Sequence, residues 1–279
     1  MKCGRATLQN LPGQQKGLSV IELLVAGVIG LILLAGVVQI YINSRQAYKL
    51  NEAMAEVQEN GAFAMALIET QLRMAGFRAD AVYNRDVTFD ADGTTFDQGQ
   101  GIKGTNNGGE NGSDLVRVRF QGDKDDTTRD CVGNGVAAGD NEGTDPVKVE
   151  FTVAVSATNN PASIPGLHCR TAAGNYEIVR GVENLQVLYG EDTAGSSTKS
   201  ASRYVGANQI TDWSRVASVR VGILVRSSEE VLQTADSSSY TLAGAVSVPQ
   251  GSSGVYHPGG RYLRRVFNST YQLRNLSYF

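Results

Sequence analysis

The sequence has few of the residues from which enzyme active sites are usually built. Among 279 residues there are two histidines, three cysteines and one tryptophan. The patterns G-x-S-x-G, H-E-x-x-H and G-x-x-x-x-G-K-[ST], which mark hydrolases, zinc proteases and phosphate-binding loops, do not occur. Because two histidines leave few candidates for a general base, we expect no enzyme activity and no cofactor.

Metal-binding patterns are also scarce. His168 stands beside Cys169, but this pair does not supply the four ligands of a structural zinc site, and His257 is expected in a surface loop. The acidic stretch Asp123–Asp130 is the remaining candidate, for Ca²⁺. It lacks the glycine at the sixth place and the glutamate at the twelfth place of an EF-hand loop. We therefore expect a solvated loop, with calcium binding as the open alternative.

A strong charge of either sign is missing as well. The formal net charge is -3 and the isoelectric point is near 5.5. These values speak against a broad electrostatic attraction to nucleic acid, so no nucleic-acid partner is expected. An apolar content of 41% is enough for one good core, and the length allows one or two domains beside a membrane segment.

What the chain does have is one long apolar run near its start. From Leu23 to Ser44 there is no formally charged residue. At about 1.5 Å per residue, a helix of this length crosses a hydrocarbon layer of about 30 Å. A cleavable secretory signal would be shorter and would end in a small-residue site, which does not follow the run. A plain signal anchor fits the length but leaves Glu22 unexplained, since an acid in lipid costs about 2.5–3.5 kcal/mol.

The block "KGLSVIELL", residues 16–24, resembles the processing site of type IV prepilins and type II secretion pseudopilins. The resemblance implies a leader over residues 1–17, cleavage by a prepilin peptidase between Gly17 and Leu18, and N-methylation of Leu18. Glu22 becomes the fifth mature residue, one helical turn from the new terminal ammonium, and the resemblance assigns it to subunit assembly. An acid and an amine together compensate charges that are each costly in lipid. The family's usual first mature residue is phenylalanine, and this sequence has leucine there.

The helix is predicted to continue past the membrane. Residues 18–45 would form its transmembrane and assembly half, and residues 46–76 an amphipathic half. We expect one helix from about Ser19 to about Ala75, ended by Gly76. Apolar residues return at steps of three and four on one face of the second half: Ala47, Leu50, Met54, Val57, Gly61, Ala64, Ile68 and Leu72.

Residues 77–279 have the pattern of a β-rich domain. Gly, Asn and Asp, which favour turns, dominate residues 80–113. Alternation of apolar residues predicts strands with one buried face, most simply one antiparallel sheet packed on the second half of the helix. The five runs lie at residues 116–120, 147–155, 182–189, 219–225 and 266–273.

The remaining segments are expected to connect these strands. Residues 190–212 and 227–261 are long and polar, which indicates surface loops. The lone Trp213 is expected in the core at the start of a strand, since a single aromatic residue is usually packed rather than a ligand platform. The fold class is therefore α+β, with the long N-terminal helix of a type IV pilin.

Later segments are similar to the PilW family of minor type IV pilins. They are "IETQLRMAGFRAD", "GSDLVRVRF", "IVRGVENLQVLYG", "WSRVASVRVGILVRS" and "RRVFNSTYQLRN". The resemblance implies a subunit that joins other minor pilins and the major pilin in a priming or tip complex. It implies residence in the bacterial inner membrane, with a periplasmic C-terminal domain, and then in the surface fibre that serves cell adhesion and twitching motility.

Two alternatives stay open at this point. Minor pseudopilins of type II secretion share the order of helix, strands and a "GVENL"-like turn. A membrane-anchored extracytoplasmic binding module or hydrolase would be a protein of a different class. Cleavage after Gly17 separates this second alternative from the pilins, because a plain anchor would keep its first 17 residues.

Removal of the predicted leader decides which cysteines remain in the mature protein. Cys3 would be lost with it, which leaves Cys131 and Cys169 in the exported domain. An even pair in an oxidising compartment favours a disulfide, with two buried free thiols as the alternative. The bridge would close a loop of about 39 residues and would stabilise the domain by roughly 4 kcal/mol in the chain-entropy model.

Overall fold

The computed structural model describes most of the chain, in two compact units. The described residues are 17, 19–78, 89–123, 125, 127–136, 147–155, 164–193, 200–244, 246–248 and 259–276. The first unit is Met1–Tyr48 and the second is Lys49–Phe279. The leader residues 1–16, Leu18 and His257 lie outside the described residues.

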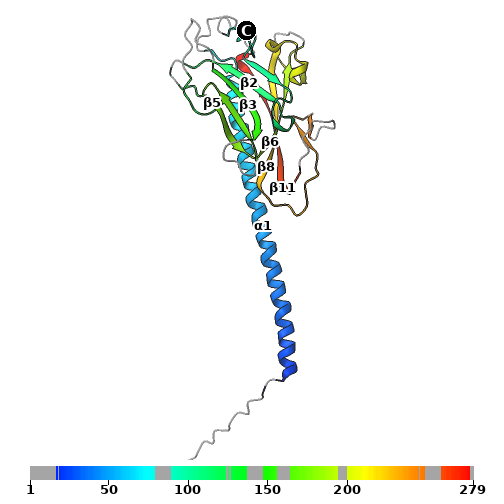
Figure 1. Cartoon of the computed structure of the whole chain (residues 1–279). Coiled ribbons are helices and arrows are strands. Elements are labelled where there is room, and N and C mark those ends of the chain that lie inside the picture. Colours follow the sequence, from blue (N-terminus) through cyan, green and yellow to red (C-terminus); the bar gives the residue numbers. More distant parts are fainter. Residues whose placement is uncertain are drawn as a thin grey trace, which may run out of the picture. The chain divides into compact units, whose positions relative to one another are not determined.

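Helix α1, Val20–Met74, is the one long helix of the described chain (Figure 1). Its bounds agree within one residue with the predicted start and end. In the first unit its side chains are exposed almost throughout. After Met74 the chain leaves the helix through Gly76, whose φ of 74° lies in the left-handed region that glycine adopts without strain. The N–H of Gly76 donates to the carbonyl oxygen of Arg119, at 2.9 Å.

One face of α1 is buried in the second unit. The predicted apolar stripe is confirmed from Val57 onward but is wrong at Ala47, which is exposed, and at Met54, which is 42% exposed. Ala53 is buried in place of Met54, because the helix turns a slightly different face to the sheets than the steps of three and four suggested. The buried residues of α1 are Ala53, Val57, Gly61, Ala64, Met65, Ile68, Gln71 and Leu72.

The strands form two main antiparallel sheets rather than the single sheet expected (Figure 1). The five-stranded sheet has the order β1-β2-β3-β4-β5. Its strands are β1 (Ile102–Thr105), β2 (Leu115–Phe120), β3 (Val147–Val155), β4 (Pro165–Thr171) and β5 (Gly174–Arg180). The four-stranded sheet has the order β11-β8-β6-β7. Its strands are β6 (Val182–Glu191), β7 (Arg203–Val205), β8 (Val216–Glu230) and β11 (Tyr262–Gln272).

Short elements lie in the segments expected to be loops. Residues 190–212 contain β7 and the 3-10 helix η2 (Ala207–Gln209), and residues 227–261 contain the ribbon of β9 (Tyr240–Leu242) and β10 (Val246–Val248). Residues 80–113 contain β1 and η1 (Glu110–Gly112). Two more 3-10 turns, η3 (Trp213–Arg215) and η4 (Arg274–Leu276), precede β8 and follow β11.

A single hydrophobic core joins α1 to both main sheets. Strand β6 is buried on both faces, because residues of the five-stranded sheet and of α1 belong to the same cluster. The prediction of one buried face was therefore wrong for this strand. Members of the cluster come from α1 (Val57, Ile68, Leu72), from the five-stranded sheet (Phe151, Leu167) and from the four-stranded sheet (Val187, Ile223).

Candidate functional site

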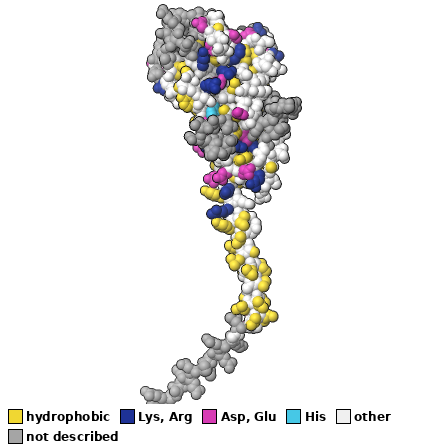
Figure 2. All heavy atoms as spheres, viewed as in Figure 1, with side chains coloured by type: hydrophobic (Ala, Val, Ile, Leu, Met, Phe, Trp, Pro, Cys, Tyr) yellow, Lys and Arg dark blue, Asp and Glu magenta, His cyan; other side chains and the backbone are white. Residues whose placement is uncertain are grey.

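The first unit presents an apolar helix surface. Over an 18-residue window its mean hydropathy is 2.7, which is apolar enough for a membrane-crossing helix. None of that window is buried within the chain. Hydrophobic side chains gather along this segment on the face shown in Figure 2. The exposed large residues are Val20, Ile21, Leu23, Leu24, Val25, Val28, Ile29, Leu31, Ile32, Leu33, Leu34, Val37, Val38, Ile40, Tyr41 and Ile42.

Glu22 closes the first turn of this helix. The backbone N–H of Ser19 donates a hydrogen bond of 3.0 Å to Oε2 of Glu22. The carbonyl oxygen of Ser19 accepts the N–H of Leu23, at 3.2 Å, so Ser19 stands at the N-cap position and Glu22 at the third helical position. This is the backbone half of a capping box, which the spacing S-x-x-E could have revealed from the sequence. In a lipid environment the bond satisfies a donor that water cannot reach.

The predicted cleavage pair is described only in part. Gly17 is exposed and outside the helix, and no atom lies within 4 Å of the position that a Cβ would take there. Leu18, the predicted new N-terminus and methylation site, lies outside the described residues. The pairing of Glu22 with a terminal ammonium therefore stays a prediction.

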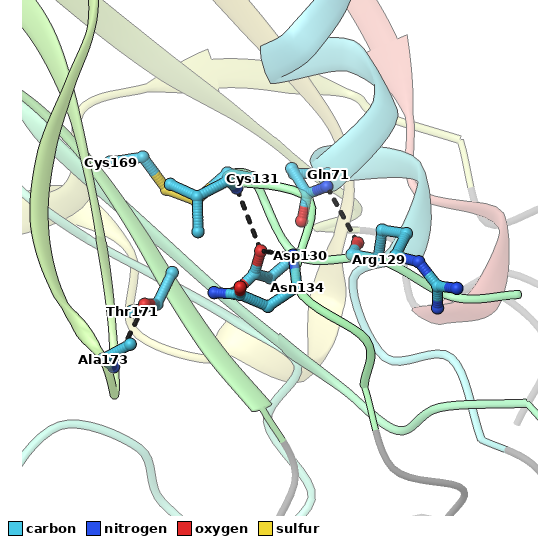
Figure 3. The surroundings of a disulfide bond; sticks show 9 residues. Gln71, Arg129, Asp130, Cys131, Asn134, Cys169, Thr171 and Ala173 are labelled. Carbon is cyan, nitrogen blue, oxygen red and sulfur yellow. Dashed lines mark hydrogen bonds between the residues drawn. A yellow bond between two sulfur atoms is a disulfide. The ribbon is translucent and has the colours of Figure 1, made fainter. Parts of the chain in front are cut away.

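Cys131 and Cys169 are joined by a disulfide, which confirms the sequence prediction (Figure 3). Their Cα atoms are 6.4 Å apart and both residues are buried in the main core. Cys169 lies on β4, and Cys131 lies in the irregular segment that follows β2. The side-chain amide of Gln71 on α1 donates to the carbonyl oxygen of Arg129, at 3.3 Å. The bridge and this bond hold the segment against both β4 and α1.

The acidic stretch Asp123–Asp130 uses its end carboxylates to shape turns. Oδ1 of Asp123 accepts the N–H groups of Thr127 and Thr128, at 2.8 and 2.9 Å, and hydrogen bonds from these two residues lower the pKa of Asp123. Oδ1 of Asp130 accepts N–H groups of Val132 and Asn134. Among the described residues no three His, Cys, Asp or Glu side chains gather to hold a metal ion. Calcium binding is thus left without a supporting geometry in the described part.

Trp213 and His168, two further candidates from the sequence, are core residues. Trp213 is 7% exposed, lies in η3 just before β8, and meets the ring of Tyr189 edge-on at 4.8 Å between centroids. His168 on β4 is 4% exposed, and neither ring nitrogen has a hydrogen-bond partner among the described residues. Burial lowers the pKa of His168, although the nearby Glu177 acts in the opposite direction. The ring therefore packs as a core side chain.

A buried charge network was not foreseen from the sequence. Glu183 on β6 is fully buried, and its carboxylate accepts two hydrogen bonds from Arg264 on β11, at 2.6 and 3.1 Å. Arg226 on β8 lies 3.4 Å from the same carboxylate. Nη1 of Arg264 donates to Asp236 at 3.0 Å. Burial acts to raise the pKa of Asp236. Hydrogen bonds, of which the one from Tyr240 has the largest effect, lower this pKa to about 2. Together these ion pairs tie three strands to the segment after β8.

A known protein family matches the C-terminal part of the chain. Residues 150–275 match the family model of PilW, described as type IV pilus-assembly protein W. This part of the chain is similar to the PilW family. The matched PilW region runs from β3 through η4, so it includes Cys169 and the Glu183 network but not α1 or Cys131.

Comparison with solved structures gives a distant similarity to the type IV-like pilin TTHA1219 from Thermus thermophilus. The sequence identity is 15% and the TM-score is 0.40, over 78% of this chain and 97% of that chain. No curated protein matches. A PilW-like region that follows an N-terminal apolar helix, the one candidate membrane span among the described residues, fits a membrane-anchored protein of type IV pilus assembly.

Proposed function

We propose that this protein is a minor pilin that joins other minor pilins in the priming or tip complex of a type IV pilus. The observation that carries the proposal is the PilW match over residues 150–275 in a chain whose α1 begins with an exposed apolar segment. A non-enzymatic role is consistent with both features, since each serves packing between subunits.

Processing is the first step of the proposed function. The prepilin peptidase cuts between Gly17 and Leu18, and Leu18 becomes the methylated N-terminus. The exposed Gly17 and the open space around its Cβ position support access to this bond. The apolar part of α1 then holds the protein in the inner membrane, with the C-terminal domain in the periplasm, until it passes into the fibre.

Assembly is the second step. The large apolar side chains of α1 from Val20 to Ile42 are exposed, so burial against lipid or against other helices removes them from water. Glu22 carries the charge that a neighbouring terminal ammonium requires in lipid. The contact partners are the other minor pilins and the major pilin.

The test is a pull-down of the full-length protein from host membranes, followed by identification of the bound subunits. The proposal expects the other minor pilins of a type IV pilus, and loss of surface fibres when the gene is deleted. Recovery of secretion pseudopilins instead would assign the protein to type II secretion. Recovery of neither class, with normal piliation in the deletion strain, would contradict the proposal.

A further inference from the structure

We propose that the free edge of β11 is a docking site for an extended segment of another pilin subunit, which adds a strand to the four-stranded sheet. The inference rests on the proposed function for the kind of partner, and it deepens that function by naming the surface and the mode of binding. Strand addition is a recurring mode of recognition in which backbone hydrogen bonds supply the affinity.

The backbone on one side of β11 has no partner strand in the described part of the chain. Tyr262–Gln272 pairs with β8 along nearly its full length and is the last strand in the order β11-β8-β6-β7. Among the described residues, none forms a backbone hydrogen bond with the outer side of this strand between Arg265 and Gln272. A row of unpaired N–H and C=O groups is a template for another strand.

The other sheet edges in the described chain are shorter. Strand β1 has 4 residues and β7 has 3, so neither offers a long ladder. Strand β5 has 7 residues, and its last carbonyl, at Arg180, accepts a bond from Asn60 of α1. Strand β11 has 11 residues. It therefore offers the longest open edge of the described part.

Both faces of β11 are already in use, which leaves only its edge. On one face, the ring of Phe267 packs against Gly61 of α1, and the hydroxyl of Tyr271 donates to the carbonyl oxygen of Met65 at 3.3 Å. On the other face, Val266 packs with Leu242 of the short ribbon, and Oδ1 of Asn268 accepts the N–H of Ala243 at 2.8 Å. An incoming strand would thus extend the sheet rather than stack on it.

The direction of α1 and the charge of Arg265 both speak against a second copy at the same edge. The contacts between α1 and the C-terminal segment follow the same order along both segments. Gly61 contacts Phe267, Met65 contacts Tyr271, and Arg73 contacts Asn275. The helix and β11 therefore run in the same direction. An antiparallel pair of two β11 strands would point residues 61–73 of the two copies in opposite directions. A parallel pair would set the exposed Arg265 of one copy against Arg265 of the other, and like charges on adjacent strands repel. We therefore assign the edge to a different segment, supplied by another subunit.

The charge on the edge indicates what the partner segment carries. The side chain of Arg265 is exposed and has no carboxylate partner among the described residues. Its guanidinium lies 5.7 Å from the centroid of the Phe267 ring. Side chains that face each other on adjacent strands lie about 5 Å apart. The incoming strand should therefore place an Asp or Glu opposite Arg265.

Photo-crosslinking in host membranes tests the edge directly. Full-length protein carries a photoreactive amino acid at Thr270, which is exposed on β11, or at the control position Asn175, which is exposed on β5. We expect a crosslink from Thr270 to another pilin subunit, localised by mass spectrometry to an extended segment with a carboxylate. Position Asn175 should give little product. Arg265→Glu should lower the Thr270 yield about fivefold through like-charge repulsion, while Arg274→Glu, another exposed arginine beyond the strand, should leave it unchanged.

The outcomes separate this inference from the proposed function. If other minor pilins co-purify but Thr270 gives no crosslink, or gives one only to a second copy, the docking site is wrong and the pilin function stands. A crosslink that Arg265→Glu and Arg274→Glu weaken equally would refute the predicted carboxylate partner. If no pilin subunit co-purifies at all, the proposed function fails and the docking site fails with it.

Discussion

The backbone N–H of Ser19 donates a 3.0 Å hydrogen bond to the carboxylate of Glu22, so the acid at the start of α1 already has a partner within its own chain. Such a cap contributes about 1 kcal/mol to a helix. In the predicted mature chain, Leu18 carries the terminal ammonium and directly precedes Ser19 in the sequence. Glu22 thus caps its own helix, and its pairing with the terminal ammonium of a neighbouring subunit stays a prediction.

Substitution of Glu22 separates these two roles. Glu22→Ala removes both the cap and the charge, whereas Glu22→Gln keeps an oxygen that can accept the Ser19 N–H. We expect both variants to lose the leader normally, since Gly17 is unchanged. Both should lose about tenfold or more in co-purified pilin subunits, because an unpaired ammonium in lipid disfavours docking. The control is Glu59→Gln, an exposed acid on the same helix. Full partner binding by Glu22→Gln would show that the cap alone matters.

The disulfide is predicted to stabilise the soluble domain from about residue 46. It joins residues 38 positions apart, and closing a loop of this size stabilises by about 4 kcal/mol in the chain-entropy model. Reduction, or the paired change of Cys131 and Cys169 to serine, should therefore lower the Tm by about 10 °C. Calorimetry with and without reductant measures this difference. An unchanged Tm after verified reduction would show that the bridge does not limit stability.

Among the charged sites of the domain, the Glu183 network should be the one at which a substitution lowers the free energy of unfolding most. Glu183 and the Arg264 side chain are both fully buried, so Glu183→Ala leaves a buried cation without its acid. Loss of one partner of a buried pair costs about 3–5 kcal/mol. Glu229→Ala, at an acid whose side chain is 76% exposed, should change stability by less than about 1 kcal/mol. Urea denaturation of the soluble domain compares them, and equal effects would contradict the account.

Asp114 predicts a pH dependence of stability. Burial raises the pKa of Asp114 to about 6, although its carboxylate accepts the N–H groups of Val187 and Asn107. Because the folded pKa exceeds the unfolded one, the folded state binds the proton more tightly. This contribution to stability is present in acid and is lost as the pH rises through about 6.

The measurement is the difference in unfolding free energy between the parent and Asp114→Asn from pH 4 to pH 7. The parent should lose about 2 kcal/mol relative to the variant over this range. Because acids with lowered pKa values, such as Asp236, are common to both proteins, their effects cancel in the difference. A difference that is flat with pH would refute the raised pKa of Asp114.

The sequence predicted elements whose signal is local. The bounds of α1 followed from its apolar run, its periodicity and Gly76, all of which act within a few turns. Strands β4 and β5 were missed, because "PGLHCRT" and "GNYEIVR" alternate over only a few residues, with two apolar positions each in Leu167 and Cys169 and in Tyr176 and Ile178. Their burial depends on partners far along the chain.

Polar side chains in the core were beyond sequence reasoning for the same reason. Glu183 is buried because Arg264 meets it from another strand. Arg119 is 1% exposed, and its guanidinium donates to the backbone carbonyl oxygens of Gln100, Asp90, Phe89 and Asp97. Alternation placed Arg119 on the outside of β2, since a single sequence does not show which carbonyl groups the fold brings to it.

The central claim is that the protein is a processed prepilin, and the intact mass of the membrane-extracted protein tests it most directly. The account predicts a chain that begins at Leu18, and Gly17→Trp should abolish the cut because the peptidase requires a small residue there. Edman sequencing of the same sample fixes the first residue independently of any methyl group. A chain that begins at Met1, or one that is cut beyond Ala35, would contradict the account.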